Sequence, residues 1–200
     1  MHVDTELALR GIVPDPPPHA WEKEADHLTE DAAAFIVESP FAVLATADAS
    51  GRCDASPRGG PPGFAAVLDP RRIVIPDYTG NRRQDSHRNI IANPFVGLVF
   101  FVPGVLETLR VNGRATLNTD PDLLASLATG GQRSKLAIDI SIDVAFVHCG
   151  KAPIRSHLWD PSTWPTGISL ACARAAGTSE SPDEVQARWD EAYRDPAQVW

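Results

Sequence analysis

The segment IPDYTGNRRQDSHRNIIANP (75–94) combines charged residues with a helix-start pattern. Asn81, followed three residues later by Gln84, predicts a helix N-terminus. This start would place Arg82 and Arg83 in the first helical turn, where the helix dipole disfavours cations. Two arginines there are explained if an anion lies between them and the free backbone N–H groups. The segment therefore predicts a phosphate site, and two solvated side chains on a surface helix are the alternative.

The sequence SPRGG (56–60) follows a predicted strand. Pro57 is expected to end strand pairing, which would let Arg58 project sideways. Gly59 and Gly60 allow the backbone to come close to a ligand or a partner chain. The segment predicts either a ligand site or a strand terminus with a surface arginine.

The segment ETLRVNGRA (107–115) is predicted to present Arg110, Asn112 and Arg114 on the outward face of a strand. Adjacent cations on one strand repel one another, so they need either acids elsewhere in the chain or a bound anion. Pairing with acids is the favoured interpretation.

The segment HCGKAPIRSHLW (148–159) contains further candidate ligands and cations. His148 and Cys149 lack a second pair at zinc-type spacing, so no metal site is predicted, and His148 is expected to be buried. Lys151 and Arg155 are four residues apart, so on a helix they would share one face.

Other catalytic patterns are absent from the sequence. It has no Gly-x-Ser-x-Gly elbow, no phosphate-binding Walker loop and no Gly-x-Gly-x-x-Gly. Cys53 and Cys172 have no local feature that would lower a thiol pKa. No side-chain nucleophile with a positioned base is predicted, and the catalytic residues are left unassigned.

Strand and turn patterns dominate the chain from Phe41 onward. Alternation in the last predicted strand places Ile138, Ile140, Ile142 and Val144 on the inward face. Six or seven antiparallel strands with a few helices indicate a mostly β fold, a small closed or split barrel. The predicted strands are 41–47, 52–57, 64–69, 73–77, 94–102, 109–117 and 135–149.

Helices are predicted around these strands. Four helices are expected. The first begins after Thr29 and runs to Pro40, and the second begins near Asn81 and ends at Asn93-Pro94. The third runs from Asp120-Pro121 to Gly130-Gly131, and the fourth begins at a capping box, Ser181 to Glu184. Val185, Trp189 and Tyr193 are expected on the inner face of the last one. Residues 13–20, VPDPPPHA, predict an extended arm that cannot be helical. The expected organisation is an N-terminal arm (1–28), a barrel (29–160) and a helical extension packed on it (161–200).

Charge is unevenly distributed along the 200 residues. The formal net charge is −8, yet residues 52–114 hold nine Arg, no Lys and five acids. The overall acidity argues against non-specific nucleic-acid binding, which needs many Lys and Arg. No apolar stretch is long enough for a membrane span or has the form of a signal peptide. Three widely spaced cysteines fit a reducing, cytoplasmic location.

The four motifs, taken in this order, resemble the pyridoxamine 5′-phosphate oxidase-like FMN-binding split-barrel flavoproteins, from about Phe41 to Trp159. Among them, the sequence is similar to a branch described only as FMN-dependent enzymes. The resemblance implies a six-stranded antiparallel split β-barrel with peripheral helices. It also implies a homodimer with two FMN molecules in clefts between the subunits.

The resemblance implies roles for individual residues. Arg58 would approach the flavin phosphate or pyrimidine edge, Ile75 and Pro76 would line the ring, and Arg82 and Arg83 would bind the phosphate. The implied cofactor-binding set is Arg58, Ile75, Pro76, Asp77, Asn81, Arg82, Arg83, Thr108, Arg110, Lys151 and Arg155.

Two departures from the family pattern limit the implied function. Thr108 stands where the oxidases proper carry a flavin-contacting Gln, and its hydroxyl reaches less far. An Arg-x-His occurs at Arg155-Ser156-His157 but not at the chain end, so oxidation of vitamin B6 is not implied.

The resulting hypothesis is an FMN-dependent oxidoreductase that transfers hydride at flavin N5 with an unidentified small-molecule substrate. A deazaflavin-dependent reductase is the first alternative. A non-catalytic flavin or haem binder, with His148 or His87 as candidate axial ligands, is the second. A purely structural dimerisation domain is the third. Core or interface packing is favoured over cofactor stacking for Trp159 and Trp164.

Overall fold

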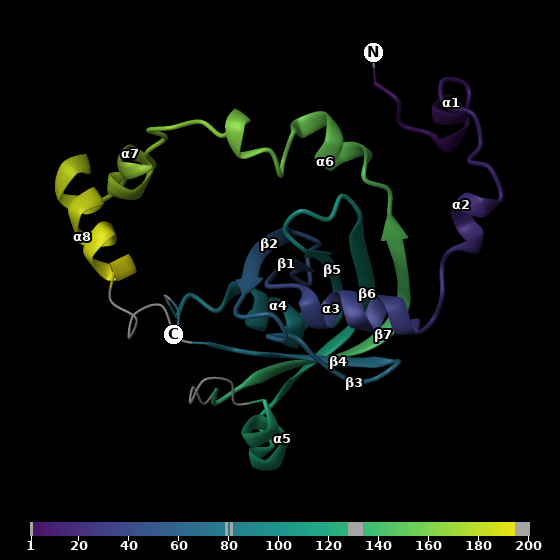
Figure 1. Ribbon diagram of the computed structural model, residues 1–200, viewed down its shortest axis with the longest axis horizontal. Coiled ribbons are helices and arrows are strands. Elements are labelled where there is room, and N and C mark those ends of the chain that lie inside the picture. The colour runs from purple at the N-terminus through teal and green to yellow at the C-terminus, as the bar shows by residue number, and fades with distance from the viewer. Residues whose placement is uncertain (1, 79, 81, 128–133, 195–200) are drawn as a thin grey trace.

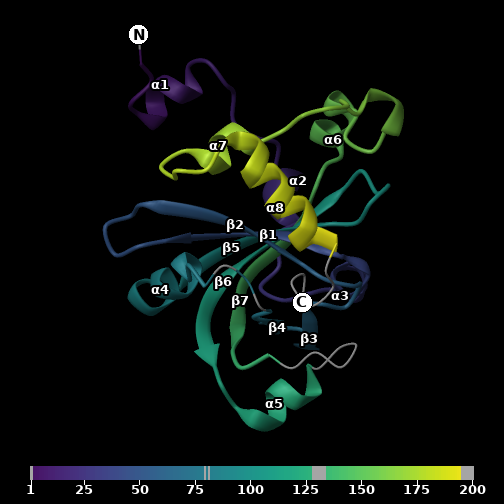
Figure 2. The ribbon, with the colours of Figure 1, turned by 90° about the vertical axis from the view of Figure 1, so that its left-hand side faces the viewer.

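The computed structural model describes residues 2–78, 80, 82–127 and 134–194, and Figures 1 and 2 show their arrangement. Seven strands form one antiparallel sheet in the order β2-β1-β5-β6-β7-β4-β3. The strands are β1 (Phe41–Ala47), β2 (Cys53–Gly59), β3 (Ala66–Asp69), β4 (Arg72–Pro76), β5 (Phe95–Phe101), β6 (Thr108–Asn118) and β7 (Ala137–His148). The predicted mostly β, split-barrel architecture is confirmed.

The implied count of six strands is wrong by one. The short strand β3 pairs with β4 alone and forms the edge of the sheet. The two strands make a hairpin around Pro70 and Arg71, and this position agrees with the turn between the predicted strands 64–69 and 73–77. The sequence pattern identified each of the seven strands, and the lower count came from the resemblance.

The core lies inside the bend of the sheet. β6 and β7 are the two longest strands, and they join the β2-β1-β5 side of the sheet to the β4-β3 side. Their inward residues Leu109, Val111, Ile138 and Ile140 are at most 1% exposed. The helix α3 (Glu30–Glu38) packs against β3 and β6, while α4 (Asp85–Ala92) packs against β1, β2 and β6. The edge strand β2 and the helix α4 therefore lie next to each other.

A β-bulge interrupts the alternation of β7. The register against β6 shifts between Asn112 and Gly113, so Asp143 has no partner in the ladder. Beyond this extra residue the inward position passes to Ala145, which is 4% exposed, and Val144 is only half-buried. The prediction that Val144 points into the core is therefore wrong at the bulge.

The expectation that Pro57 ends strand pairing is also wrong. Pro57 pairs with Val43, and β2 continues through Arg58 to Gly59. β2 is an edge strand with β1 as its only neighbour, and proline is tolerated at an edge because its missing N–H can face away from the ladder.

Three of the four predicted helix starts are confirmed. Asp120 caps α5 (Pro121–Ser126) by accepting hydrogen bonds from the N–H groups of Asp122 and Leu123. Thr29 caps α3 by accepting a hydrogen bond from the N–H of Ala32. The helix α8 (Pro182–Arg194) begins with a capping box, in which the Ser181 N–H donates to Glu184 Oε2 at 2.8 Å and the Glu184 N–H donates to Ser181 Oγ at 3.3 Å. In α8, Val185 is fully buried as predicted, whereas Tyr193 is 59% exposed.

The remaining helices lie at the periphery of the barrel, with α1 and α2 on one side and α7 and α8 on the other (Figure 1). They are α1 (Glu6–Arg10), α2 (His19–Glu22), α5 (Pro121–Ser126), α6 (Lys151–Ser156), a 3₁₀ turn at Pro161–Thr163, and α7 (Ala171–Ala175). α2 begins inside the predicted non-helical arm, whose prolines end at Pro18. α5 ends earlier than predicted, and Gly130-Gly131 lie outside the described residues. No helix within the described ranges is long and apolar enough to cross a membrane.

A half-buried ion pair joins three strands. Asp139 on β7 accepts hydrogen bonds from Arg72 of β4 at 2.9 Å (Nε) and 2.7 Å (Nη2), and from Asn118 Nδ2 of β6 at 2.9 Å. The Asp139 side chain is 11% exposed. The hydrogen bond from Arg72 lowers the pKa of Asp139, opposed by burial. The carboxylate therefore stabilises the fold while it is ionised.

We expect Asp139→Asn to lower the free energy of unfolding by about 1–2 kcal/mol at pH 7, since Arg72 is itself partly exposed. A lowered pKa means that this stabilisation is present above the unfolded-state pKa of about 3.9 and is lost as pH falls through the folded-state pKa. Urea unfolding at pH 7 and pH 3 should show the difference between wild type and variant shrinking at pH 3. The exposed Glu24→Gln is the control, and an equal difference at both pH values would contradict the assignment.

Candidate functional site

A cleft opens between β2, the chain after β4 and the start of α4. Its volume is about 360 Å³. A second hollow of about 430 Å³ adjoins it, and the two share Pro57, Arg58, Tyr78 and Gly80. The cleft is lined by Asp54, Ala55, Ser56, Pro57, Arg58, Asp77, Tyr78, Gly80, Arg82, Arg83, Gln84, Asp85, Ser86 and His87. The second hollow is lined by Pro57, Arg58, Gly59, Gly60, Pro61, Phe64, Ile75, Pro76, Tyr78 and Gly80.

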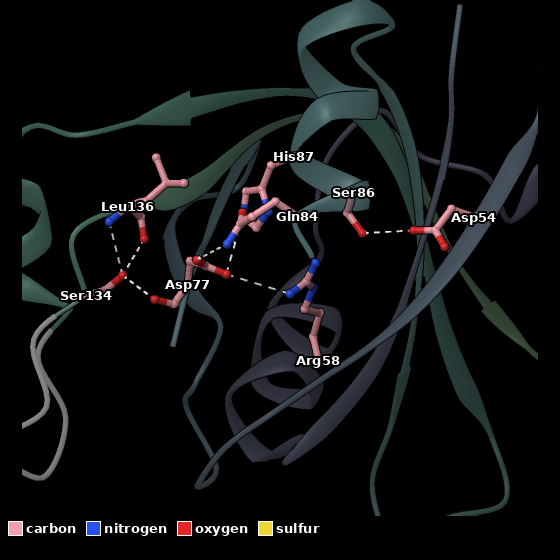
Figure 3. Close-up of polar contacts among 8 residues, drawn as sticks. All are labelled: Asp54, Arg58, Asp77, Gln84, Ser86, His87, Ser134 and Leu136. Carbon is pink, nitrogen blue, oxygen red and sulfur yellow. Dashed lines mark hydrogen bonds and ion pairs between the residues drawn. The ribbon is translucent and has the colours of Figure 1, made fainter. Parts of the chain in front are cut away.

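Asp77 is fixed in the cleft by its backbone. Its N–H donates to the Leu136 carbonyl at 2.8 Å, and its carbonyl accepts from Ser134 Oγ at 2.7 Å. Both partners belong to the segment that leads into β7. The backbone of Asp77 therefore directs its carboxylate toward α4 and β2, as Figure 3 shows.

Three side chains approach that carboxylate (Figure 3). Arg58 Nη1 lies 3.8 Å from Asp77 Oδ1, and His87 Nε2 lies 3.4 Å from the same oxygen. Gln84 Nε2 donates to Asp77 Oδ2 at 3.4 Å. The Asp77 carboxylate thus lies among the cations of the cleft, and its three side-chain contacts are longer than an ordinary hydrogen bond.

Arg58 is the most enclosed cation of the cleft, with a side chain 20% exposed. Burial lowers the pKa of its guanidinium, and Asp77 and Asp54 oppose this effect. Its buried Nε–H has no hydrogen-bond partner among the described residues. An unsatisfied N–H on a buried cation is costly unless an acceptor, such as an anion, is supplied. The site is therefore suited to an anionic group.

The helix α4 begins three residues later than the pattern of Asn81 and Gln84 predicts, because its N-cap position is Gln84 and not Asn81. Gln84 occupies the N-cap position with φ 60° and makes no side-chain capping hydrogen bond, and Arg82 has φ 59°, so the chain before Asp85 is not helical. Arg82 and Arg83 therefore precede the helix and do not lie in its first turn, which removes the dipole argument for an anion. Asn81 lies outside the described residues.

Arg82 and Arg83 nevertheless line the cleft, and both are exposed. Arg83 and Arg88 each contact the carboxylate of Asp85, whose pKa the Arg83 hydrogen bond lowers most. Arg83 is therefore partly neutralised by an acid at the mouth of the cleft.

α4 is held against the sheet by two polar contacts. Ser86 Oγ donates to Asp54 on β2 at 3.1 Å, and Asn89 Nδ2 donates to Thr46 on β1 at 3.0 Å. His87, 5% exposed, lies between these contacts and lines the cleft. Burial lowers the pKa of His87; Asp77 raises it and Arg58 lowers it further.

The second hollow has an apolar wall. Ile75 is 2% exposed, Phe64 is 2% exposed and Pro76 is buried. A Cβ on Gly60 would lie 2.8 Å from the Cβ of Phe64, so a residue with a side chain would push this wall apart. A flat apolar group could occupy this hollow beside a charged group in the cleft.

The structure thus brings together only part of the predicted site. Arg58, Ile75, Pro76, Asp77, Arg82 and Arg83 line the two adjoining hollows. Thr108, Arg110, Lys151 and Arg155 do not line them. Asp54 and Ser56 are not among the predicted site residues, although the alternation of β2 places both on the same side as Arg58.

The four predicted site residues outside the cleft lie at the start of β6 and on α6, which follows the end of β7. Arg110 lies over the Phe146 ring at 5.4 Å and donates to Asn112 Oδ1 at 3.1 Å. Thr108 is buried and faces His148 across the ladder, while Lys151 and Arg155 are exposed on α6.

Further sequence-based predictions concern residues outside the cleft. Arg114 pairs with Asp143 at 3.0 Å, which confirms pairing with an acid for that residue. His148, the last residue of β7, is half-buried and not fully buried as expected. Trp159 and Trp164 donate to the carbonyls of Val105 and Leu158 and do not line either hollow. No group of three or more potential metal-ligating side chains occurs among the described residues.

Comparison with solved structures finds similar chains. HupZ of Group A Streptococcus is 18% identical, with 60% of this chain and 93% of that chain covered and a TM-score of 0.50. A pyridoxamine 5′-phosphate oxidase candidate from Lactobacillus delbrueckii is 24% identical (61% and 95% covered, TM-score 0.47). HutZ, the heme storage protein from Vibrio cholerae, is 17% identical (61% and 94% covered, TM-score 0.42).

Sequence comparison assigns the family. A search of curated proteins finds no match. The family model described as pyridoxamine 5′-phosphate oxidase matches residues 28–146, which include β1 to β6, α4 and most of β7. This match covers more than half of the chain and contains the cleft and the adjoining hollow. The chain therefore belongs to the pyridoxamine 5′-phosphate oxidase family of split-barrel proteins.

Proposed function

We propose that this protein is an FMN-dependent oxidoreductase. The observation that carries the proposal is the half-buried side chain of Arg58, whose buried Nε–H lacks a partner among the described residues, at the junction of a charged cleft and an apolar hollow. FMN has two corresponding parts, a phosphate dianion that suits the charged cleft and a flat ring system that suits the apolar hollow. Arginine binds phosphate through a planar, bidentate fork, which suits it to this role.

The residues divide between the two ends of the cofactor. Arg58, Arg82 and Arg83 would bind the phosphate, and Ile75 and Pro76 would line the ring. The Asp77 carboxylate could accept hydrogen bonds from the ribityl hydroxyls that join the two ends. When bound, FMN would accept hydride at N5 from a small-molecule substrate and pass the electrons to an acceptor. The protein would position and enclose the flavin.

We also propose that the protein is a homodimer with FMN at the subunit interface. Thr108, Arg110, Lys151 and Arg155 lie outside the cleft of their own protomer. In a two-fold dimer, the same patch of both subunits forms the interface, so residues outside one cleft can complete the partner's cleft. The free, exposed cysteines Cys53, Cys149 and Cys172 support a reducing location, which we propose to be the cytoplasm.

Titration of the purified protein with FMN tests the cofactor. We expect quenching of flavin fluorescence with one FMN per chain, and weaker binding of riboflavin, which lacks the phosphate. Binding should weaken as salt rises, because exposed Arg82 and Arg83 are screened. A deazaflavin and haem are the competing ligands. Failure to bind FMN, or tighter binding of either competitor, would reject FMN as the cofactor.

Two further measurements test the dimer and the activity. Light scattering should give twice the chain mass with FMN bound, and a monomer at the same FMN occupancy would contradict the interfacial site. A panel of small reduced substrates should include one that bleaches the flavin absorbance without oxygen. If FMN binds and neither small-molecule nor nicotinamide reductants bleach it, the protein is a flavin-binding module and not an enzyme.

A further inference from the structure

His87 is a buried titratable group that the phosphate site does not use directly. It is 5% exposed, and neither ring nitrogen has a hydrogen-bond partner among the described residues. Its Nε2 lies 3.4 Å from Asp77 Oδ1, close enough for electrostatic attraction but without the geometry of a hydrogen bond. A buried imidazole with neither nitrogen satisfied is costly, so its position needs an explanation.

The charges around His87 come from three elements. Asp77, after β4, and Arg58, on β2, act on it directly and with opposite sign. On its own helix, Asp85 is already paired with Arg83 and Arg88. Asp54 of β2 is held by Ser86, and the Tyr78 phenol also lines the cleft. The interior of the cleft therefore holds Arg58 and Asp77, whose charged groups lie 3.8 Å apart, beside an imidazole whose pKa is lowered by burial.

A phosphate dianion changes this balance. If it binds Arg58, it shares that guanidinium with the Asp77 carboxylate and repels the carboxylate, whose side chain is only 17% exposed. Like charges in such a site favour proton uptake by the nearest group able to accept one. His87 is that group, because its ring nitrogen faces Asp77 Oδ1 and its pKa is lowered by burial, which leaves it neutral near pH 7.

We propose that His87 takes up one proton when the phosphate group of the cofactor enters the cleft, and so acts as a positioning residue that makes the site selective for the phosphorylated flavin. The inference rests on the proposed FMN function. The proton moves from solvent to a ring nitrogen of His87, and no bond of the ligand changes. The imidazolium then neutralises Asp77, which frees the Arg58 guanidinium for the phosphate.

Calorimetry with FMN at pH 7.5, in two buffers of different ionisation enthalpy, measures the proton directly. We expect wild-type protein to take up close to one proton per FMN and none with riboflavin. The phosphate itself contributes little at this pH, because its second pKa is about 6. No uptake by wild-type protein would overturn the inference without any variant being needed.

The variant His87→Gln tests whether His87 is the residue that takes up the proton. From pH 7 to 8.5 we expect the wild-type Kd for FMN to rise about 10- to 30-fold more than that of the variant, since one linked proton gives at most a tenfold change per pH unit. His27→Gln is the matched control, because it removes an exposed histidine 2.8 Å from a carboxylate outside the cleft and should keep the wild-type slope. His87→Asn replaces the glutamine variant if that variant fails to fold.

The outcomes separate the inference from the proposed function. Wild-type protein that does not bind FMN at any pH rejects the function. FMN binding with equal proton uptake in wild type and His87→Gln overturns only the role of His87.

Discussion

Replacing Arg58 by Ala should weaken FMN binding by about 10- to 150-fold, because each charge-assisted hydrogen bond contributes about 1.5–3 kcal/mol. The effect is expected to be larger than for Arg82 or Arg83, which are exposed and screened by solvent. The Asp77 carboxylate would add to the loss, since it would face the phosphate without its nearest arginine. Flavin fluorescence titration measures the change in Kd.

Two further variants separate charge from geometry. Arg52→Ala makes the same change in net charge at a side chain 86% exposed, so its Kd should stay within about twofold of wild type. Arg58→Lys keeps the charge but loses the planar fork, so its Kd should fall between wild type and Arg58→Ala. If Arg58→Ala binds FMN with wild-type affinity and circular dichroism shows an intact fold, the assignment of the phosphate to this cleft is wrong.

Replacing Gly113 by Ala should lower the free energy of unfolding by about 3 kcal/mol, which corresponds to roughly 6–12 °C in Tm for a chain of this size. A Cβ at this position would lie 2.1 Å from the Ser141 carbonyl oxygen, and both groups belong to paired backbones. The two central strands would have to separate at the bulge, because no side chain is available to rotate away. Thermal unfolding without FMN measures the loss.

Gly11→Ala is the control for this substitution. The nearest atom to its Cβ would lie 3.4 Å away, at the end of α1, and its φ of −68° suits any residue. We expect a change within about 0.5 kcal/mol. If Gly113→Ala were as stable as Gly11→Ala, the close approach of β6 to β7 at the bulge would be wrong.

Much of the fold follows from local patterns. The alternation of Ile138 and Ile140 with polar residues identifies β7, and Thr29 and Ser181 mark helix starts through hydrogen bonds within one turn of chain. The pattern fails where a single extra residue at Asp143 reverses the alternation, because a bulge has no distinctive composition here. Residue patterns therefore predict elements well and interruptions within them poorly.

The site was only partly predictable for a different reason. Asn81 and Gln84 carry a helix-start pattern, yet left-handed backbone at Arg82 and Gln84 delays the helix to Asp85. Such a conformation depends on contacts made by distant segments and not on the four residues of the motif. The approach of Arg58 to Asp77 likewise depends on how β2 and β4 are placed by the whole sheet.

The edge position of β2 has a dynamic consequence. Because β1 is its only neighbour in the sheet, β2 is held by one ladder and by its contact with α4, and we expect it to open more readily than the core strands. A ligand that bridges Arg58 to the chain after β4 would act as a substitute for the missing second neighbour. The residence time of the cofactor would then depend on how often β2 opens, because release of the ligand would require local unfolding of this strand.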